Sequence, residues 1–339
     1  MTPLNSVLIV DDEPAVRDIM ARWVSSLGLR PATAANADEA LATMRTHHYD
    51  LAVIDVMMPG HDGLWLATEL QRDHPHTAVV IATAYTALLD DDAQQRPVAD
   101  FLIKPFQRER FALAVDRGRQ WRQRAIEEVE WHARLATELQ DRTAQVIATL
   151  GERATGGESE ERALTALCLE RAPEMAAHGE RVARYARSLA RELGVDDELG
   201  SALETAARLH DVGKIAMPEA LLTKPSPFTA GEMAIMRRHV NVGAEILQST
   251  HTLGAAASAV LASHEWFSGG GYPLRLAGSD IPLSSRIIAV VDAYDAMTQD
   301  RVYRVRLDSA DAVAELLRCR RSQFDPDVVA GFLATIGRH

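Results

Sequence analysis

The stretch VLIVDDEPAVRDIMARWVSSLG, residues 7–28, indicates how the N-terminal part of the chain folds. Its apolar start, residues 7–10, is a short strand that runs into Asp11 and Asp12. Pro14 stands where proline favours the first turn of a helix, and Gly28 stops that helix. Strand-like segments recur at residues 51–54, 79–82 and 101–103. Because strands alternate with helices, the sequence predicts a doubly wound parallel sheet.

Charged and polar residues follow the ends of these predicted strands. They are Asp11, Asp12, Asp55, Thr83 and Lys104. The carboxyl ends of parallel strands meet at one edge of a sheet, so these side chains are expected to lie together. Neighbouring carboxylates would hold a hard cation such as Mg²⁺. One carboxylate can then act as a nucleophile toward a phosphoryl group that Lys104 and Thr83 contact.

This ordered set resembles a response-regulator receiver domain, expected over residues 1–118. The matching residues are Asp11, Asp12, Asp55, Met58-Pro59, Asp62-Gly63, Thr83-Ala84, Phe101 and Lys104-Pro105. The resemblance implies a flavodoxin-like, five-stranded parallel sheet, Mg²⁺ at the acidic edge, switch roles for Thr83 and Phe101, and a cis bond before Pro105. It also implies phosphorylation of Asp55 by a cognate sensor histidine kinase. Residues 88–98 read unlike the usual short helix, so the output face is expected to differ there.

A long helix is predicted from about residue 107 to residue 150, and residues 119–157 are expected to link two domains. Seven positions of this helix recur with alternating steps of three and four, and two of them are occupied by His and Thr. The seven residues are Val129, His132, Ala136, Leu139, Thr143, Val146 and Leu150. The spacing favours a dimerising coiled coil and hence a homodimer; the alternative is one amphipathic helix that lies on its neighbours. Gly156 and Gly157 are expected to end the helix.

The bulk composition limits the classes of function. The chain has 339 residues, 47% of them hydrophobic, and a net charge of -12. A DNA-binding output or an anionic-membrane binder would need a basic face, so neither is expected. No apolar run approaches the roughly 20 residues that cross a bilayer, and no signal peptide is seen. Cys168 and Cys319 form neither a disulfide framework nor a zinc spacing, which favours a cytoplasmic location.

Metal-ligand residue types are spread over the C-terminal half. They include His210-Asp211, His239, His264 and Asp292. A histidine next to an aspartate can serve two metals, because the carboxylate can bridge them. Glu174 and His178 are four residues apart, so both can face one metal from one side of a helix. These donors suit iron, manganese, nickel or zinc. A closely spaced metal pair favours in-line attack on a phosphoester, so the pattern indicates a phosphodiesterase.

From residue 158 to the C-terminus, the chain resembles the HD-GYP family of cyclic-dinucleotide phosphodiesterases. The matching residues are Glu174, His178, Arg181, the string His210 to Lys214, His239, His264-Glu265, Gly271 to Pro273, the string Asp292 to Thr298, Arg301, Tyr303 and Arg304. The resemblance implies an all-α HD-domain metal phosphohydrolase fold with two or three divalent transition metals. Iron is the first choice, with manganese or nickel as alternatives. The implied ligands are Glu174, His178, His210, Asp211, His239, His264 and Asp292.

The same resemblance implies roles in catalysis and substrate binding. Asp211, the natural bridging ligand, and Lys214 are expected to be catalytic, and a bound cation would lower the pKa of a water molecule by several units. Substrate contacts are expected from Lys214, Gly271, Tyr272, Arg301 and Arg304. The cations would hold phosphate oxygens, and Tyr272 would stack on the guanine side. Core packing is the alternative for Tyr272, and Arg304 taken alone is typical of a solvated charge.

One position departs from the HD-GYP pattern. Ser263 stands where the first of two adjacent histidines is usual, so one imidazole ligand is absent. We therefore expect a two-component response regulator in which phosphorylation at Asp55 controls metal-dependent hydrolysis of cyclic di-GMP to pGpG or GMP. The alternative is a catalytically weak HD-GYP signalling or scaffold module. It would act through protein contacts, for instance with GGDEF-type proteins.

Overall fold

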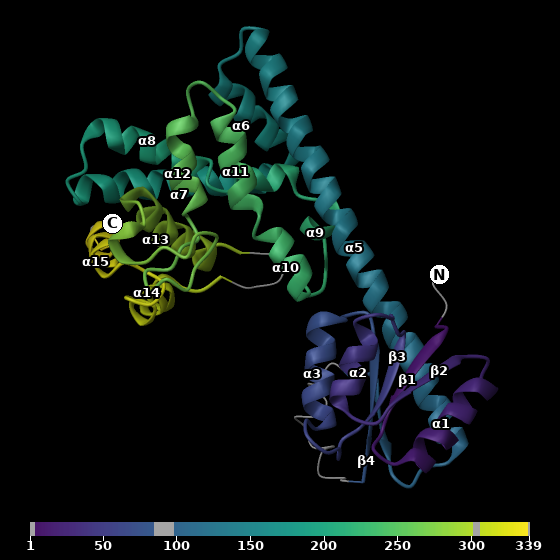
Figure 1. Cartoon of the computed structure of the whole chain (residues 1–339). Coiled ribbons are helices and arrows are strands. Elements are labelled where there is room, and N and C mark those ends of the chain that lie inside the picture. The colour runs from purple at the N-terminus through teal and green to yellow at the C-terminus, as the bar shows by residue number, and fades with distance from the viewer. Residues whose placement is uncertain (1–3, 85–97, 301–305, 338–339) are drawn as a thin grey trace. The chain divides into compact units, whose positions relative to one another are not determined.

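The computed structural model describes residues 4–84, 98–300 and 306–337, and Figure 1 shows the path of the chain. The chain divides into two compact units, Met1–Trp131 and His132–His339. Helix α5 (Arg108–Thr155) is continuous across this division and contributes to both units. Each unit carries one of the two groups of functional side chains expected from the sequence.

The first unit contains a sheet of parallel strands in the order β2-β1-β3-β4-β5. The strands are β1 (Ser6–Val10), β2 (Arg30–Ala34), β3 (Leu51–Asp55), β4 (Ala78–Thr83) and β5 (Asp100–Ile103). The predicted five-stranded, flavodoxin-like fold is confirmed. Strand β2 lacks the apolar run by which the other strands were predicted from the sequence. It lies at the edge of the sheet and exposes most of its residues.

Alternation along each strand divides the core of this unit between the two faces of the sheet. Val7 and Ile9 pack with α1 (Pro14–Ser26) and the start of α5, whereas Leu8 and Val10 point to the opposite face. There α2 (Ala37–Met44) and α3 (Gly63–Asp73) cover the sheet. Burial on both faces explains the nearly unbroken apolar sequence of β1, β3 and β4.

The second unit is helical. Its elements are α6 (Glu160–Arg171), α7 (Pro173–Glu192), α8 (Asp197–Arg208), η2 (Val212–Ala216), α9 (Glu219–Leu222), α10 (Ala230–Met236), α11 (His239–Gln248), η3 (Gly254–Ala256), α12 (Ala257–Leu261), η4 (Gly278–Asp280), α13 (Leu283–Thr298), α14 (Ser309–Arg318) and α15 (Pro326–Ile336). Tyr185, Tyr294 and Phe332 join α7, α13 and α15 in an aromatic cluster with ring centroids 5.0 to 5.9 Å apart. This packing holds α7 and α13, which carry candidate metal ligands, in fixed positions.

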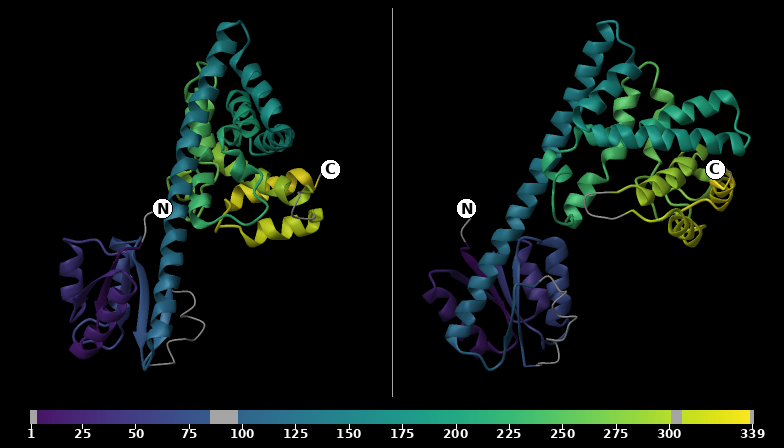
Figure 2. Two further views of the ribbon diagram at one scale, coloured as in Figure 1. Left: turned by 90° about the vertical axis from the view of Figure 1, so that its right-hand side faces the viewer. Right: turned by 180° about the vertical axis from the view of Figure 1, so that it is seen from behind.

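Helix α5 ends at Thr155, and Gly156 and Gly157 follow it as expected. Figure 2 shows that α5 runs without a break. In the second half of the predicted heptad stripe, Leu139, Val146 and Leu150 are each at most 3% exposed within the single chain. Val129, in the first half, is 50% exposed. The second half of the stripe therefore packs as an amphipathic helix on its neighbours.

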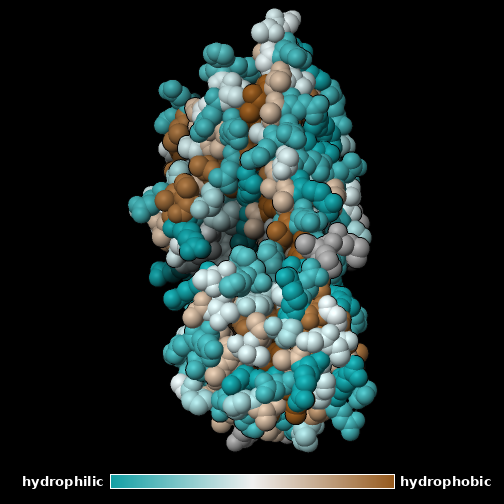
Figure 3. Space-filling model, turned by 45° about the vertical axis from the view of Figure 1, so that its right-hand side comes forward, coloured by the Kyte–Doolittle hydropathy of each residue, from teal (hydrophilic) through white to brown (hydrophobic). Residues whose placement is uncertain are grey.

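Hydrophilic residues cover most of the face shown in Figure 3, with hydrophobic residues between them. The larger exposed apolar side chains include Met57, Trp266 and Leu274. Among the described residues, no helix combines the length and the apolar character that crossing a membrane requires.

Candidate functional site

The acidic residues of the first unit meet at the carboxyl edge of the sheet. Carboxylate oxygens of Asp11, Asp12 and Asp55 lie within 4.8 Å of one another. Lys104 places its Nζ atom 2.8 Å from Asp11 Oδ2 and 2.8 Å from Asp55 Oδ1. Burial raises the pKa of Asp55, although the Lys104 ammonium group opposes this. Three converging oxygen ligands match the preference of Mg²⁺ for hard donors.

Neighbouring residues of the receiver pattern support this edge. Asp62 caps α3 by accepting a hydrogen bond from the Trp65 backbone N–H at 2.7 Å. Thr83 is fully buried at the end of β4, Phe101 is half-buried, and the Lys104-Pro105 bond is cis as expected. The departure expected over residues 88–98 lies outside the described residues except for Val98.

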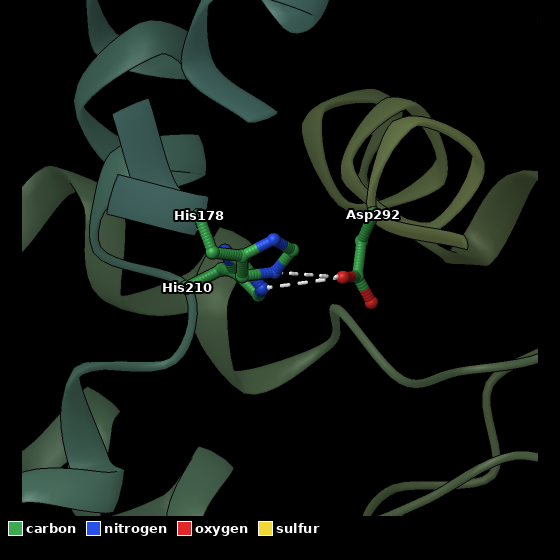
Figure 4. A group of neighbouring side chains, drawn as sticks. All are labelled: His178, His210 and Asp292. Carbon is green, nitrogen blue, oxygen red and sulfur yellow. Dashed lines mark ion pairs between the residues drawn. The ribbon is translucent and has the colours of Figure 1, made fainter. Parts of the chain in front are cut away.

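The first group of metal-ligand side chains in the second unit is His178, His210 and Asp292 (Figure 4). His178 comes from α7, His210 follows α8, and Asp292 comes from α13. The Nε2 atoms of His178 and His210 lie 3.0 Å and 3.7 Å from Asp292 Oδ1. Burial lowers the pKa of His178, but hydrogen bonds with Asp292 and Asp295 outweigh it and raise the pKa to about 9.

The second group is Asp211, His239 and His264. His239 Nε2 lies 3.4 Å from Asp211 Oδ1 and 3.2 Å from His264 Nε2. Burial lowers the pKa of His239 to about 4 and also lowers that of His264, so both rings are neutral at pH 7. Lys214 donates to Asp211 Oδ2 at 2.6 Å. Because His210 and Asp211 are adjacent in sequence, the two groups form one centre, which we call the metal centre.

Backbone carbonyls determine which nitrogen of two histidines is available. His210 Nδ1 donates to the Ala207 carbonyl at 2.8 Å, and His239 Nδ1 donates to the Met236 carbonyl at 2.9 Å. A carbonyl only accepts, so each Nδ1 carries the proton and each Nε2 lone pair faces the metal centre. Within the described structure, His210 Nε2 and Asp211 Oδ1 are buried without a hydrogen-bond partner. Buried nitrogen and oxygen atoms with unused lone pairs are suitable ligands for a divalent transition metal.

Asp295 orients the His178 ring by binding its Nδ1 atom. Its carboxylate is fully buried and accepts from His178 Nδ1 at 2.7 Å. Arg181 holds the same carboxylate with hydrogen bonds of 2.8 and 2.9 Å. A carboxylate that orients a ligating histidine is a common feature of metal sites. Asp295 is not among the site residues predicted from the sequence, although its spacing of three from Asp292 places both on one face of α13.

Two glycines allow the backbone to pack closely around the metal centre. A Cβ atom on Gly213 would lie 1.9 Å from the His239 carbonyl oxygen, so only glycine lets η2 approach α11. A Cβ atom on Gly271 would lie 2.2 Å from the Trp266 backbone nitrogen. Glu265 stabilises the loop that follows by accepting from the backbone N–H groups of residues 274–276 at 2.6 to 3.1 Å.

Tyr272 lies on this loop and contacts the metal centre itself. Its ring stacks on the His264 imidazole, with centroids 5.2 Å apart and planes inclined by 8°. The Arg237 guanidinium lies 5.0 Å from the Tyr272 centroid. Burial raises the pKa of Tyr272 to about 12, so the phenol stays protonated. Tyr272 therefore supports a candidate metal ligand in this structure.

Other expected site residues lie apart from the two ligand groups. Glu174 is exposed and lines a hollow together with His178 and Asp211, but it belongs to neither group. Ser263 is 3% exposed, and its hydroxyl donates to the Val260 carbonyl at 2.8 Å. Each group retains three donors without a contribution from Ser263. Arg301, Tyr303 and Arg304 lie outside the described residues.

Comparison with known protein families matches both units. The response regulator receiver domain matches residues 7–116, and the HD domain matches residues 162–328. The chain is 32% identical to the cyclic di-GMP phosphodiesterase response regulator RpfG of Xanthomonas campestris pv. campestris (strain 8004), over 97% of this chain and 87% of that protein. It is 30% identical to a cyclic di-GMP phosphodiesterase of Thermotoga maritima, over 97% of this chain and 89% of that protein.

Other matches cover one part of the chain. A 3'3'-cGAMP-specific phosphodiesterase of Vibrio cholerae is 40% identical over 47% of this chain and 31% of its own length. The structure of the response regulator TrrA of Thermotoga maritima is 28% identical and covers 34% of this chain and 98% of that one, with a TM-score of 0.31.

Proposed function

Because the chain belongs to the family of response regulators that join a receiver domain to an HD domain, we propose that it hydrolyses cyclic di-GMP under the control of phosphorylation at Asp55. The product would be pGpG or GMP. The relatives that match along nearly the whole chain are named for cyclic di-GMP, which favours this substrate over cGAMP. The observation that carries the proposal is the metal centre, with two adjoining groups of three donors each.

We assign the two donor groups to two divalent transition metals, with iron first and manganese or nickel as alternatives. Such metals would supply Lewis-acid stabilisation of the phosphate and an acidified water. Asp211 would bridge the two groups, because its Oδ1 lies 3.4 Å from His239 Nε2 and its Oδ2 lies 3.6 Å from His210 Nε2. Lys214 would neutralise charge that develops on the phosphate. A cognate histidine kinase, a cytoplasmic location and Mg²⁺ at the receiver edge complete the proposal.

The test combines metal analysis with a cyclic di-GMP hydrolysis assay on protein purified without oxygen. We expect the unmodified protein to bind metal and hydrolyse cyclic di-GMP, and Asp211→Ala to lose both. Ser263→His should bind metal more tightly, by about tenfold or more. Residues that only hydrogen-bond to metal ligands already change metal affinity by that factor, so an added ligand should do at least as much. An unmodified protein that is inactive with full metal, and stays inactive as Ser263→His, would favour the scaffold alternative.

A further inference from the structure

Two adjoining hollows extend from the metal centre toward helix α5, and together we call them the groove. The hollow at the metal centre has a volume of about 620 Å³ and is lined by His178, Asp211 and Lys214 among others. An adjoining hollow of about 820 Å³ is lined by Arg142 of α5 and Arg171 of α6. Both hollows share the wall residues Glu174, Met175, Lys214 and Leu222, so they adjoin. All of these residues belong to the second unit.

The far end of this groove carries two arginine side chains. Arg171 donates weakly to the Ile215 carbonyl at 3.4 Å, which tethers it to η2 just beyond Lys214. No ion pair joins Arg171 to a carboxylate in the part of the chain that the structure describes. Arg142 is paired with Glu138 at 2.8 Å, yet its side chain is still 32% exposed. Both guanidinium groups are therefore accessible to an anion in the groove.

Acidic residues line both hollows, and Asp211, Asp295 and Asp300 do so at the metal centre. Glu174 and Glu219 line the other hollow with the two arginines. Glu174 stands in the first turn of α7, where no side chain caps the backbone N–H groups. The Glu174 carboxylate itself offsets the partial positive charge of those N–H groups. The groove thus places two guanidinium groups beyond the metal centre, with Lys214 among the residues that both hollows share.

A cyclic dinucleotide carries two phosphodiesters on opposite sides of its ring, and one metal centre engages only one of them. We propose that Arg171, together with Arg142, binds the second phosphate, the one that is not cleaved. Guanidinium groups suit this role because they offer paired N–H donors that match phosphate oxygens. The inference rests on the proposed function, and it adds a specificity site for substrates with two phosphates.

The experiment compares cyclic di-GMP with bis(p-nitrophenyl) phosphate, which has a single phosphodiester. For Arg171→Ala and Arg142→Ala we expect the ratio of kcat/KM for cyclic di-GMP to kcat/KM for the small diester to fall roughly ten- to hundredfold, the size typical of a lost charge-assisted hydrogen bond. The loss should appear in KM. Arg171→Lys should lose less. Arg318→Ala is the matched control, because Arg318 is exposed on α14 and pairs with Glu315.

Several results would overturn the inference. An unchanged ratio in Arg171→Ala would do so, as would an equal loss on both substrates, which would indicate general damage to the metal centre. A loss on cyclic di-GMP but not on cyclic di-AMP would show that the arginine reads the guanine edge instead. If the unmodified protein cleaves neither substrate, the proposed function fails, and calorimetric binding of cyclic di-GMP decides this inference separately. Absence of that binding would reject both.

Discussion

At the scale of single residues, the metal centre depends on groups that hold the histidines in one tautomer. Backbone carbonyls do this for His210 and His239, and no substitution can remove them. Asp295 does it for His178 through a side chain that can be changed. Asp295 therefore offers a direct test of whether the donor groups are arranged to bind metal.

We expect Asp295→Ala to lower metal affinity by roughly 10- to 100-fold, since the His178 ring would lose the acceptor that orients it. Asp295→Asn keeps an acceptor and should lose less. Arg181→Met is the matched control, because it removes the ion pair but leaves the carboxylate on His178. Affinity would be measured by competition with a chelator on folded protein. Equal losses in Asp295→Ala and Arg181→Met would show that Asp295 acts through packing alone.

The same residues show how far the sequence could predict this site. The donor types appear in the sequence in an order that indicates a phosphodiesterase, and the structure gathers His178, His210, Asp211, His239, His264 and Asp292. The stacking of Tyr272 on His264 could not be foreseen, because it depends on the course of a loop that Glu265 holds. Likewise, only the packing of α5 and α6 brings Arg142 and Arg171 to one groove.

At the scale of elements, α5 shows what periodicity leaves undetermined. Its helical spacing and the two glycines predicted the helix and its end correctly. A heptad stripe indicates that one face of a helix is buried. It does not show whether the same chain or a second copy buries that face. Leu139, Val146 and Leu150 are already buried within one chain, so they have little surface left for a second copy. The homodimer expected from the stripe stays a prediction, and it would have to use exposed positions such as Val129.

Two substitutions on α5 separate these possibilities. Leu139→Asp places a charge at a buried site and should lower the free energy of unfolding by roughly 3 kcal/mol or more. Val129→Asp should change it by less than about 0.5 kcal/mol, because the side chain is exposed. Thermal melting and light scattering measure both effects. If Leu139→Asp melts like the unmodified protein but turns a dimer into a monomer, the stripe would be an interface between chains.

At the scale of the whole molecule, two sites with different chemistry share one helix. The acidic edge of the sheet suits Mg²⁺ and an aspartyl phosphate, whereas the metal centre is rich in imidazole and suits transition metals. Helix α5 packs on the sheet through Phe111 and Ala114, and farther along it lines the groove through Arg142. If Arg142 binds substrate as proposed above, a change at Asp55 that shifts α5 would act on substrate binding.

This connection predicts which kinetic constant phosphorylation alters. Acetyl phosphate with Mg²⁺ should label the unmodified protein but not Asp55→Asn. Labelling should change KM for cyclic di-GMP by roughly fivefold or more, the usual size of allosteric coupling, and change kcat less. In Arg142→Ala most of this KM response should disappear, because Arg142 is the side chain through which we propose that α5 contacts substrate. A labelled protein in which kcat changes while KM stays constant, equally with and without Arg142, would show that the signal reaches the metal centre by a route other than this side chain.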